Sequence, residues 1–171
     1  EFNLQEHSTA TGLLRDGDRV VGVTTQFAEY RADAVVVAAG AWSGDWLAEA
    51  GLSLPVVPVK GQMLLYKREP GWLKSVVLYE GRYAIPRRDG HILIGSTLEH
   101  AGYDKRTSTQ ALESLRQSAE GLLPELRELS PVAQWAGLRP GSPEGVPYIG
   151  PVSELPGLWL NAGHYRNGLV L

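Results

Sequence analysis

The spacing between the predicted strands constrains the fold of this chain more than any other feature. Short apolar and β-branched runs recur along the sequence, and most segments between them are too short to hold a helix. Neighbouring parallel strands need a long crossover connection, whereas neighbouring antiparallel strands need only a tight turn. The sequence therefore predicts an α+β fold whose sheets are mostly antiparallel.

Turn residues mark two hairpins. An Asp-Gly pair joins a strand at 11–14 to one at 20–25, and the turn at 87–90 joins 83–86 to 91–94. Asp-Gly is a strong signal for a tight hairpin turn. Further strands are predicted at 28–31, 62–66, 76–79, 132–138 and 158–161.

One apolar run differs from the others. Residues 34–39 are continuously apolar and end in Gly40. A strand without alternation is typical of a parallel or mixed sheet, and we expect it to be buried on both faces. A short helix with Ser43 near its start should follow at 42–50.

The clearest helix is predicted at 107–122. Thr107 and Gln110 form a capping-box pattern, and apolar residues then recur at spacings of three and four. Pro124 follows the end of this pattern. We expect one apolar face that packs against a sheet.

The order of these elements predicts three segments. Residues 1–54 should be the remnant of a nucleotide-binding domain, 55–134 an antiparallel sheet domain with one helix, and 135–171 a truncated return to the first domain. The chain starts without Met and stops within an apolar run. We therefore expect a fragment of a longer protein.

Composition disfavours several classes of function. The chain of 171 residues is 43% apolar and 20% charged, as in globular proteins, and its net charge of −3 comes without a basic block, which argues against nucleic-acid binding. It has no cysteine, its histidines lack metal-ligand spacing, and it has no Gly-x-Ser-x-Gly motif. No metal site is predicted. No membrane segment is expected, and the default location is cytoplasmic.

The segment 33–43, "DAVVVAAGAWS", is the first that could serve chemistry. A strand that ends in small residues lets the backbone approach a ligand, and ligands of open α/β sheets lie at such strand ends. The alternative is a core strand followed by an ordinary turn. No Gly-x-Gly-x-x-Gly occurs, so the chain cannot cradle a pyrophosphate by that motif.

Arg139, in "WAGLRPG", is the second candidate. The proline that follows it favours an extended backbone, and an arginine at the end of a strand can bind a carboxylate through two parallel hydrogen bonds. The alternative is a surface arginine whose stem lies on apolar neighbours.

The segment 163–168, "GHYRNG", is the third candidate. It follows a predicted strand and should open an apolar helix, whose unpaired N–H groups suit an electron-rich carbonyl or an anion. The alternative is an ordinary strand–turn–helix junction with a structural His164.

Together these segments resemble the D-amino-acid oxidase superfamily of flavoenzymes. The resemblance is stronger to the glycine oxidases of thiamine biosynthesis than to sarcosine oxidases or D-amino-acid dehydrogenases. Five ordered segments carry it: "ADAVVVAAGAWS", "PVKGQML", "YAIPRRDGHILIGST", "WAGLRPGSPEGVPYIG" and "NAGHYRNGLVL".

The resemblance implies three catalytic residues. Arg139 looks like the arginine that pairs with the substrate carboxylate, and Tyr83 like the tyrosine whose hydroxyl helps to hold it. Arg166 resembles a second pocket arginine near substrate and flavin. Leu98 falls at an apolar pocket position, whereas Gly81 replaces an expected polar residue, which leaves the preferred amine open.

The resemblance also implies FAD as the cofactor of the full-length protein, although we do not expect FAD in this fragment, which lacks the family's N-terminal dinucleotide-binding unit. Residues 1–54 would then belong to a Rossmann-like FAD-binding domain. The expected FAD contacts are Ala10, Ala39, Gly40, Trp42, His164, Tyr165, Arg166, Asn167, Gly168, Leu169 and Val170.

The implied reaction is hydride transfer from the substrate Cα to the flavin, giving an imine that water hydrolyses. The expected partners are a small amino acid or amine and molecular oxygen, and a homo-oligomer is possible. Two alternatives stay open. One is a dehydrogenase that passes electrons to a quinone, and the other is a non-catalytic fragment without FAD.

Overall fold

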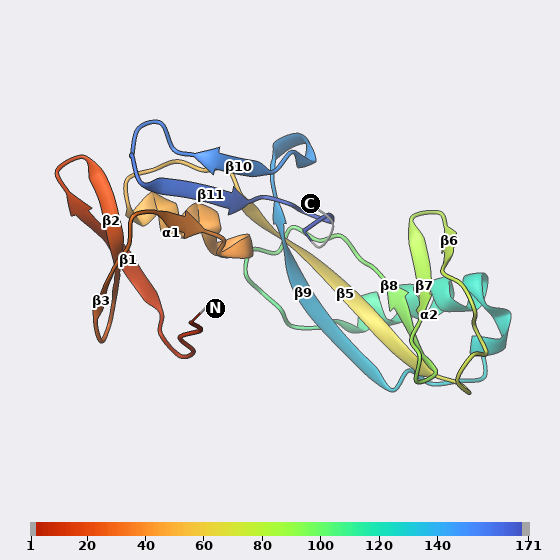
Figure 1. Ribbon diagram of the computed structural model, residues 1–171. Coiled ribbons are helices and arrows are strands. Elements are labelled where there is room, and N and C mark those ends of the chain that lie inside the picture. Colours follow the sequence, from red (N-terminus) through yellow and green to blue (C-terminus); the bar gives the residue numbers. More distant parts are fainter. Residues whose placement is uncertain (1–2, 169–171) are drawn as a thin grey trace. The chain divides into compact units, whose positions relative to one another are not determined.

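The computed structural model describes residues 3–168, and the chain divides into two compact units (Figure 1). We call one the discontinuous unit, because it combines the described residues up to Val57 with those from Pro140 onward. The other, Pro58–Arg139, is the continuous unit. Helices and antiparallel sheets occur in separate stretches of the chain, which confirms the predicted α+β class.

The discontinuous unit begins with an antiparallel sheet of β1 (Ala10–Asp16), β2 (Arg19–Thr25) and β3 (Glu29–Arg31) in that order. The predicted first hairpin is thus confirmed. Its turn places Gly17 at a φ of 55°, in the left-handed region that glycine adopts without steric cost. This explains why the Asp-Gly pair stands there.

The second sheet of this unit is mixed. Its order is β10 (Tyr148–Pro151), β11 (Leu158–Ala162) and β4 (Val35–Val37), with β11 parallel to β4 and antiparallel to β10. A 3₁₀ turn at Gly40–Trp42 then leads into α1 (Ser43–Glu49). The mixed sheet was predicted, whereas β10 was not.

The expectation that the strand at 34–39 is buried on both faces is wrong for this chain. Val37 is 5% exposed and packs in a cluster with Leu47 of α1 and Leu158 of β11, but Val36 is 60% exposed. Because β4 is an edge strand and successive side chains point to opposite faces, Val36 lies on a face that no described residue covers.

The continuous unit is built on a five-stranded sheet. β6, β7, β8 and β5 pair antiparallel in that order, β9 lies beside β5, and the predicted second hairpin is confirmed as β7–β8. β9 extends beyond its predicted end, so Arg139 lies within the strand. The bounds are β5 (Val57–Lys67), β6 (Val77–Tyr79), β7 (Arg82–Pro86), β8 (His91–Gly95) and β9 (Ala133–Gly141).

One face of this sheet is covered by α2 (Thr109–Leu122) (Figure 1). Burial of each large apolar side chain there contributes roughly 1.5–3 kcal/mol to stability. After α2, a 3₁₀ turn at Pro124–Leu126 adds Leu126 to the core between helix and sheet. This core consists of Leu64, Tyr66, Ala84, Ile92, Ile94, Leu115, Ala119 and Leu126.

The predicted cap of this helix is off by one residue. The helix begins at Thr109 and its N-cap is Ser108, whose hydroxyl accepts a hydrogen bond of 3.2 Å from the Ala111 N–H. Ser108 has an extended backbone, which aims its hydroxyl at the first turn. Thr107 therefore lies outside the cap.

The opposite face of the same sheet carries the alternate residues of its strands. Leu64 and Tyr66 point to the helix, so Gly61 and Met63 lie on the other side. No helix of the continuous unit covers this second face. We call it the uncovered face.

Within residues 3–168, no helix combines the length and the apolar character that crossing a membrane requires. The longest, α2, has 14 residues.

Candidate functional site

Tyr83 lies flat across a glycine on the uncovered face. Its register partner in β8 is Gly95, and a Cβ built at Gly95 would stand 2.5 Å from the Tyr83 hydroxyl oxygen and 2.6 Å from its ring. Real Cβ atoms essentially never approach another heavy atom closer than 3.0 Å. The ring therefore occupies space that any other residue at position 95 would fill.

Arg139 is seated in the same way one strand further along the sheet. A Cβ built at Gly61 of β5 would lie 2.6 Å from the Arg139 Cζ. The Nη2 of Arg139 donates a hydrogen bond of 2.7 Å to the Oγ of Ser96, which directly follows Gly95. The structure thus brings the carboxylate-binding candidates Tyr83 and Arg139 to one face, over two adjacent strands.

The charge of Arg139 has no acidic partner among the described residues. None of the ion pairs in residues 3–168 includes this half-buried guanidinium, and the Tyr83 hydroxyl makes no hydrogen bond there. A fixed guanidinium and a phenol that lie on the same sheet face supply N–H and O–H donors there, and the planar fork of the guanidinium matches a carboxylate. This arrangement can bind a carboxylate.

Arg166 belongs to the discontinuous unit. It is exposed, with its guanidinium carbon 5.2 Å from the centroid of the Tyr165 ring. The Tyr165 N–H donates to the Pro140 carbonyl at 2.9 Å, and the Asn167 N–H donates to the His164 carbonyl at the same distance. A role for Arg166 beside Arg139 stays a prediction.

His164 is 8% exposed, whereas Asn167 and Gly168 are exposed. Leu169 and Val170, and the apolar helix predicted to start after Gly168, lie outside the described residues. Leu98, the expected pocket residue, is 49% exposed in the segment after β8.

The other predicted FAD contacts gather near the end of β4. A hollow of about 450 Å³ in the discontinuous unit is lined mainly by apolar side chains and includes Ala10 and Ala39. Gly40 follows with a φ of 56°, and Trp42 is 48% exposed. The Ala10 carbonyl accepts a hydrogen bond of 2.9 Å from Trp46 Nε1. Small residues and exposed backbone at a strand end fit a flat apolar cofactor part that lies against the main chain.

Sequence reasoning missed Gly61, Gly95 and Ser96. An isolated glycine within a strand pattern is a signal for close approach of another group, and both glycines interrupt apolar strand patterns. No comparable signal marks Ser96, because its partner Arg139 is distant in sequence.

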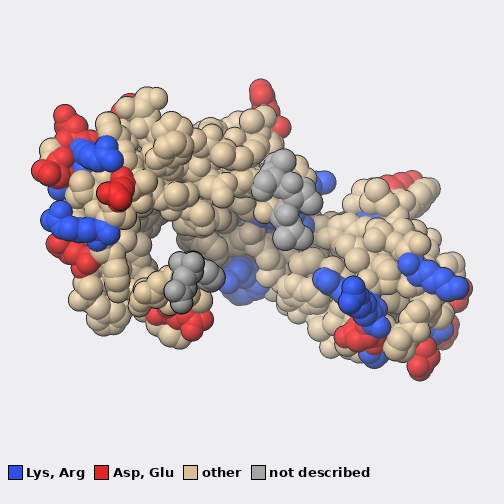
Figure 2. Space-filling model, in the orientation of Figure 1, with Lys and Arg blue, Asp and Glu red and all other residues tan. Residues whose placement is uncertain are grey.

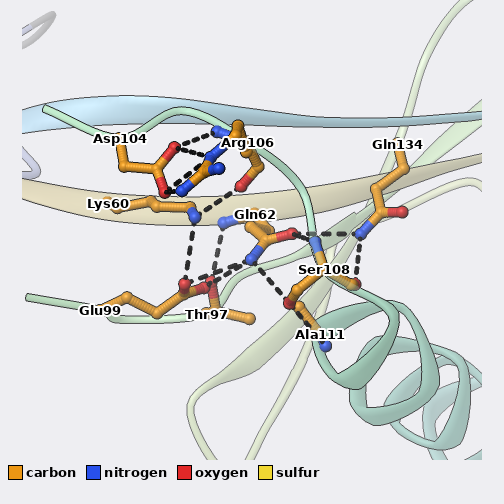
Figure 3. Close-up of polar contacts among 9 residues, drawn as sticks. All are labelled: Lys60, Gln62, Thr97, Glu99, Asp104, Arg106, Ser108, Ala111 and Gln134. Carbon is orange, nitrogen blue, oxygen red and sulfur yellow. Dashed lines mark hydrogen bonds and ion pairs between the residues drawn. The ribbon is translucent and has the colours of Figure 1, made fainter. Parts of the chain in front are cut away.

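A buried polar network lies on the helix side of the sheet (Figure 3). Gln62 has no exposed surface, and its Nε2 donates to Glu99 Oε1 at 2.9 Å and to Ser108 Oγ at 3.3 Å. Its Oε1 accepts from the Ser108 N–H at 3.0 Å and from Gln134 Nε2 at 3.1 Å. Every hydrogen-bonding group of this amide is thus used, which ties β5 and β9 to the start of α2.

Glu99 anchors the other end of the network. The Lys60 Nζ, on a side chain only 5% exposed, lies 3.4 Å from the Glu99 carboxylate (Figure 3). Burial alone would raise the pKa of Glu99, but hydrogen bonds from Thr97 and Gln62, together with Lys60, bring it below its ordinary value. Glu99 is therefore held as a carboxylate.

The charged side chains show no single basic patch on the face seen in Figure 2, where most Lys and Arg groups lie beside Asp and Glu. Within residues 3–168, no group of three or more His, Asp or Glu side chains is arranged to hold a metal ion.

Known proteins resemble this chain closely. It is 67% identical over 170 residues to the glycine oxidase of Pseudomonas aeruginosa. The alignment covers 99% of this chain and 47% of that protein. The chain thus spans about half the length of the curated relatives that it matches.

Solved structures share the fold. The glycine oxidase of Geobacillus kaustophilus aligns with a TM-score of 0.87 at 34% identity, over 97% of this chain and 45% of that one. The L-proline dehydrogenase of P. horikoshii aligns with a TM-score of 0.89 at 25% identity, over 95% and 46%. The model of the DAO family, described as FAD dependent oxidoreductase, matches residues 2–171. The chain belongs to this family of FAD-dependent oxidoreductases.

Proposed function

We propose that the protein to which this chain belongs is a flavin-dependent oxidase of glycine or of another small amino acid or amine. The observation that carries the proposal is the pair Arg139 and Tyr83, seated on two glycines of one sheet face without an acidic partner among the described residues. The identity of 67% with a glycine oxidase supports the same substrate class.

We assign the parts of the chain as follows. The segments 1–54 and 135–171 would belong to the FAD-binding part, and 55–134 would form most of the substrate domain. The compact units support such a division, with boundaries after Val57 and Arg139.

Bound FAD would supply the acceptor for a hydride from the substrate Cα, and water would then hydrolyse the imine product. Backbone at Ala10, Ala39, Gly40 and Trp42 would contact the cofactor, as would the segment that contains His164, Tyr165, Arg166, Asn167, Gly168, Leu169 and Val170. The left-handed backbone conformation at Gly40 and the hollow beside Ala39 support this assignment.

In this proposal the protein's own contribution is anchoring and orientation. The Arg139 fork and the Tyr83 hydroxyl hold the substrate carboxylate, which fixes the position of Cα. Restricting a reactant to the reactive geometry removes much of the entropic barrier, so no strong general base is required if the amine binds neutral.

The experiment is Arg139→Ala in the full-length enzyme. Loss of charge-assisted hydrogen bonds of roughly 1.5–3 kcal/mol each should raise the KM for glycine at least about tenfold. Arg88→Ala is the matched control, because Arg88 is an exposed arginine of the β7–β8 turn without a hydrogen bond or ion pair in the described residues. An unchanged KM in Arg139→Ala would reject the carboxylate role.

The second candidate function is a dehydrogenase that passes electrons to a quinone. The likeness to the L-proline dehydrogenase of P. horikoshii favours it. The two functions differ in their electron acceptor, and hydrogen peroxide formed from glycine under air identifies the oxidase.

We expect a cytoplasmic enzyme that uses molecular oxygen. A homo-oligomer is compatible with this proposal.

A further inference from the structure

We propose that Ser96 is a positioning residue that holds the guanidinium of Arg139 in its substrate-binding orientation. This inference rests on the carboxylate role of Arg139 proposed above. It assigns Ser96 no contact with the substrate.

The first step is the contact itself. The hydrogen bond of 2.7 Å from Arg139 Nη2 to Ser96 Oγ is the only one that this guanidinium makes within residues 3–168. An arginine side chain has several rotatable bonds, and fixing one end of its fork removes much of that freedom. The hydroxyl of Ser96 therefore selects one direction for the fork.

The second step is the surface beneath the guanidinium. Gly61 leaves the guanidinium lying directly on the backbone of β5, where a Cβ would stand 2.6 Å from the Arg139 Cζ. Gly61 thus sets the height of the guanidinium above the sheet, while Ser96 sets its rotation. Together they leave the remaining N–H groups of the fork for a ligand.

The third step is what holds Ser96. The Arg82 Nη1 donates a hydrogen bond to the Ser96 carbonyl, and the Arg82 Nη2 lies 3.5 Å from Ser114 Oγ on α2. Arg82 precedes Tyr83 in β7 and so reaches Ser96 from the helix side of the sheet. The backbone of Ser96 is thus held by Arg82 from the helix side, while its hydroxyl accepts the hydrogen bond from Arg139 on the uncovered face.

The test uses the full-length FAD-loaded enzyme with Ser96→Ala and Ser96→Thr. Threonine keeps the hydroxyl that accepts from Arg139. The readouts are the KM and kcat for glycine, and the Kd for glycolate measured from the change in flavin absorbance. Glycolate carries the carboxylate of glycine but a hydroxyl in place of its amine, so its Kd reports on carboxylate anchoring without a contribution from the amine.

Ser96→Ala should raise both the KM and the glycolate Kd about three- to tenfold, the range expected for one hydrogen bond, while kcat changes less than about twofold. Ser96→Thr should restore both constants to within about twofold of the wild type. Ser118→Ala is the matched control, because the hydroxyl of this half-buried serine of α2 donates to the Ser114 carbonyl at 2.9 Å and makes no other hydrogen bond within residues 3–168. It should leave all three constants unchanged.

Two results would overturn the inference while the proposed function survives. One is an unchanged KM and Kd in Ser96→Ala when Arg139→Ala raises both. The other is an equal loss in Ser96→Ala and Ser96→Thr, since the hydroxyl would then not be the group that matters. If Arg139→Ala also leaves both constants unchanged, the carboxylate role itself fails and the inference falls with it.

Discussion

At Gly61 and Gly95 the sheet lacks a Cβ, and the side chains of Arg139 and Tyr83 occupy the space that a Cβ would take. Glycine within a strand costs stability, because it gains no side-chain packing and loses more backbone freedom on folding. At these two positions the missing Cβ lets a cation and a phenol lie close to the sheet, where the surrounding protein reduces their contact with water.

The substitution Gly61→Ala tests this seat directly. The added methyl group cannot coexist with the guanidinium, so Arg139 must move, and in the full-length enzyme we expect the KM for glycine to rise about tenfold or more. Steady-state kinetics with glycine provide the measurement.

Gly121→Ala serves as the control for that substitution. Gly121 lies in α2, and a Cβ there would meet nothing within 4 Å. The Gly121→Ala enzyme should have the same KM for glycine as the wild type. If Gly61→Ala behaves in the same way, Arg139 is not held against β5 in the working enzyme.

At the scale of elements, the Gln62 network explains how α2 is attached to the sheet. An amide that uses all its donors and acceptors links β5 to the N-cap residue Ser108 and to Gln134 of β9 (Figure 3). A satisfied buried network contributes to a unique packing arrangement, whereas removing one member leaves the others without partners.

We therefore expect Gln62→Ala to lower the free energy of unfolding of the chain by roughly 2–4 kcal/mol, since it leaves several buried polar groups unpaired. Urea unfolding followed by circular dichroism measures this change. Gln117→Ala, on the exposed side of α2, should change it by less than about 0.5 kcal/mol. Equal effects of the two substitutions would show that the network contributes nothing to stability.

The same network predicts that the free energy of unfolding depends on pH in the acid range. Because the pKa of Glu99 is lowered in the folded chain, the unfolded chain binds more protons between the two pKa values. Glu99 thus stabilises the fold fully above its ordinary pKa, near 4.5, and this stabilisation is lost as the pH falls through the folded value. Stability should decline below about pH 4.5 for this reason.

Glu99→Gln should flatten part of that decline when the free energy of unfolding is measured by urea titration at pH 3 and pH 6. Glu113→Gln removes an exposed carboxylate of α2 that makes no hydrogen bond or ion pair within residues 3–168, and it is the control. A decline as steep in Glu99→Gln as in the wild type would contradict the assignment.

At the scale of the whole molecule, the residues proposed to bind the substrate carboxylate and those proposed to contact FAD lie in different units. The continuous unit carries the Arg139 and Tyr83 pair, and the discontinuous unit carries the predicted FAD contacts. The chain covers about 47% of its relative from Pseudomonas aeruginosa and contains no Gly-x-Gly-x-x-Gly segment. Half of the length of that relative therefore has no counterpart here.

We expect the purified chain of 171 residues to be colourless, because it lacks the glycine-rich segment that binds a dinucleotide pyrophosphate. The measurement is the visible absorbance spectrum after incubation with FAD and gel filtration. The full-length enzyme, treated in parallel, should retain a flavin spectrum. A stable yellow chain would contradict the expectation.

Local sequence patterns predicted the elements that depend on local interactions. The hairpin turns follow from Asp-Gly and from the segment 87–90, since turn conformation is set by a few adjacent residues. The helix at α2 follows from its apolar spacing. The cap lies one residue beyond the predicted one, because Thr107 and Ser108 can both cap a helix and the backbone conformation decides between them.

The sequence alone also determined the family, since five ordered segments carry the resemblance to it, and it marked Tyr83 and Arg139 as candidates. Only the tertiary structure decided that these two side chains share one sheet face, that glycines 61 and 95 seat them, and that Ser96 holds the guanidinium. It also decided that Val36 is exposed, although its apolar run suggested burial. The physical reason is the same throughout: strand order and register bring together residues that are distant in the chain, and no local pattern encodes those pairings.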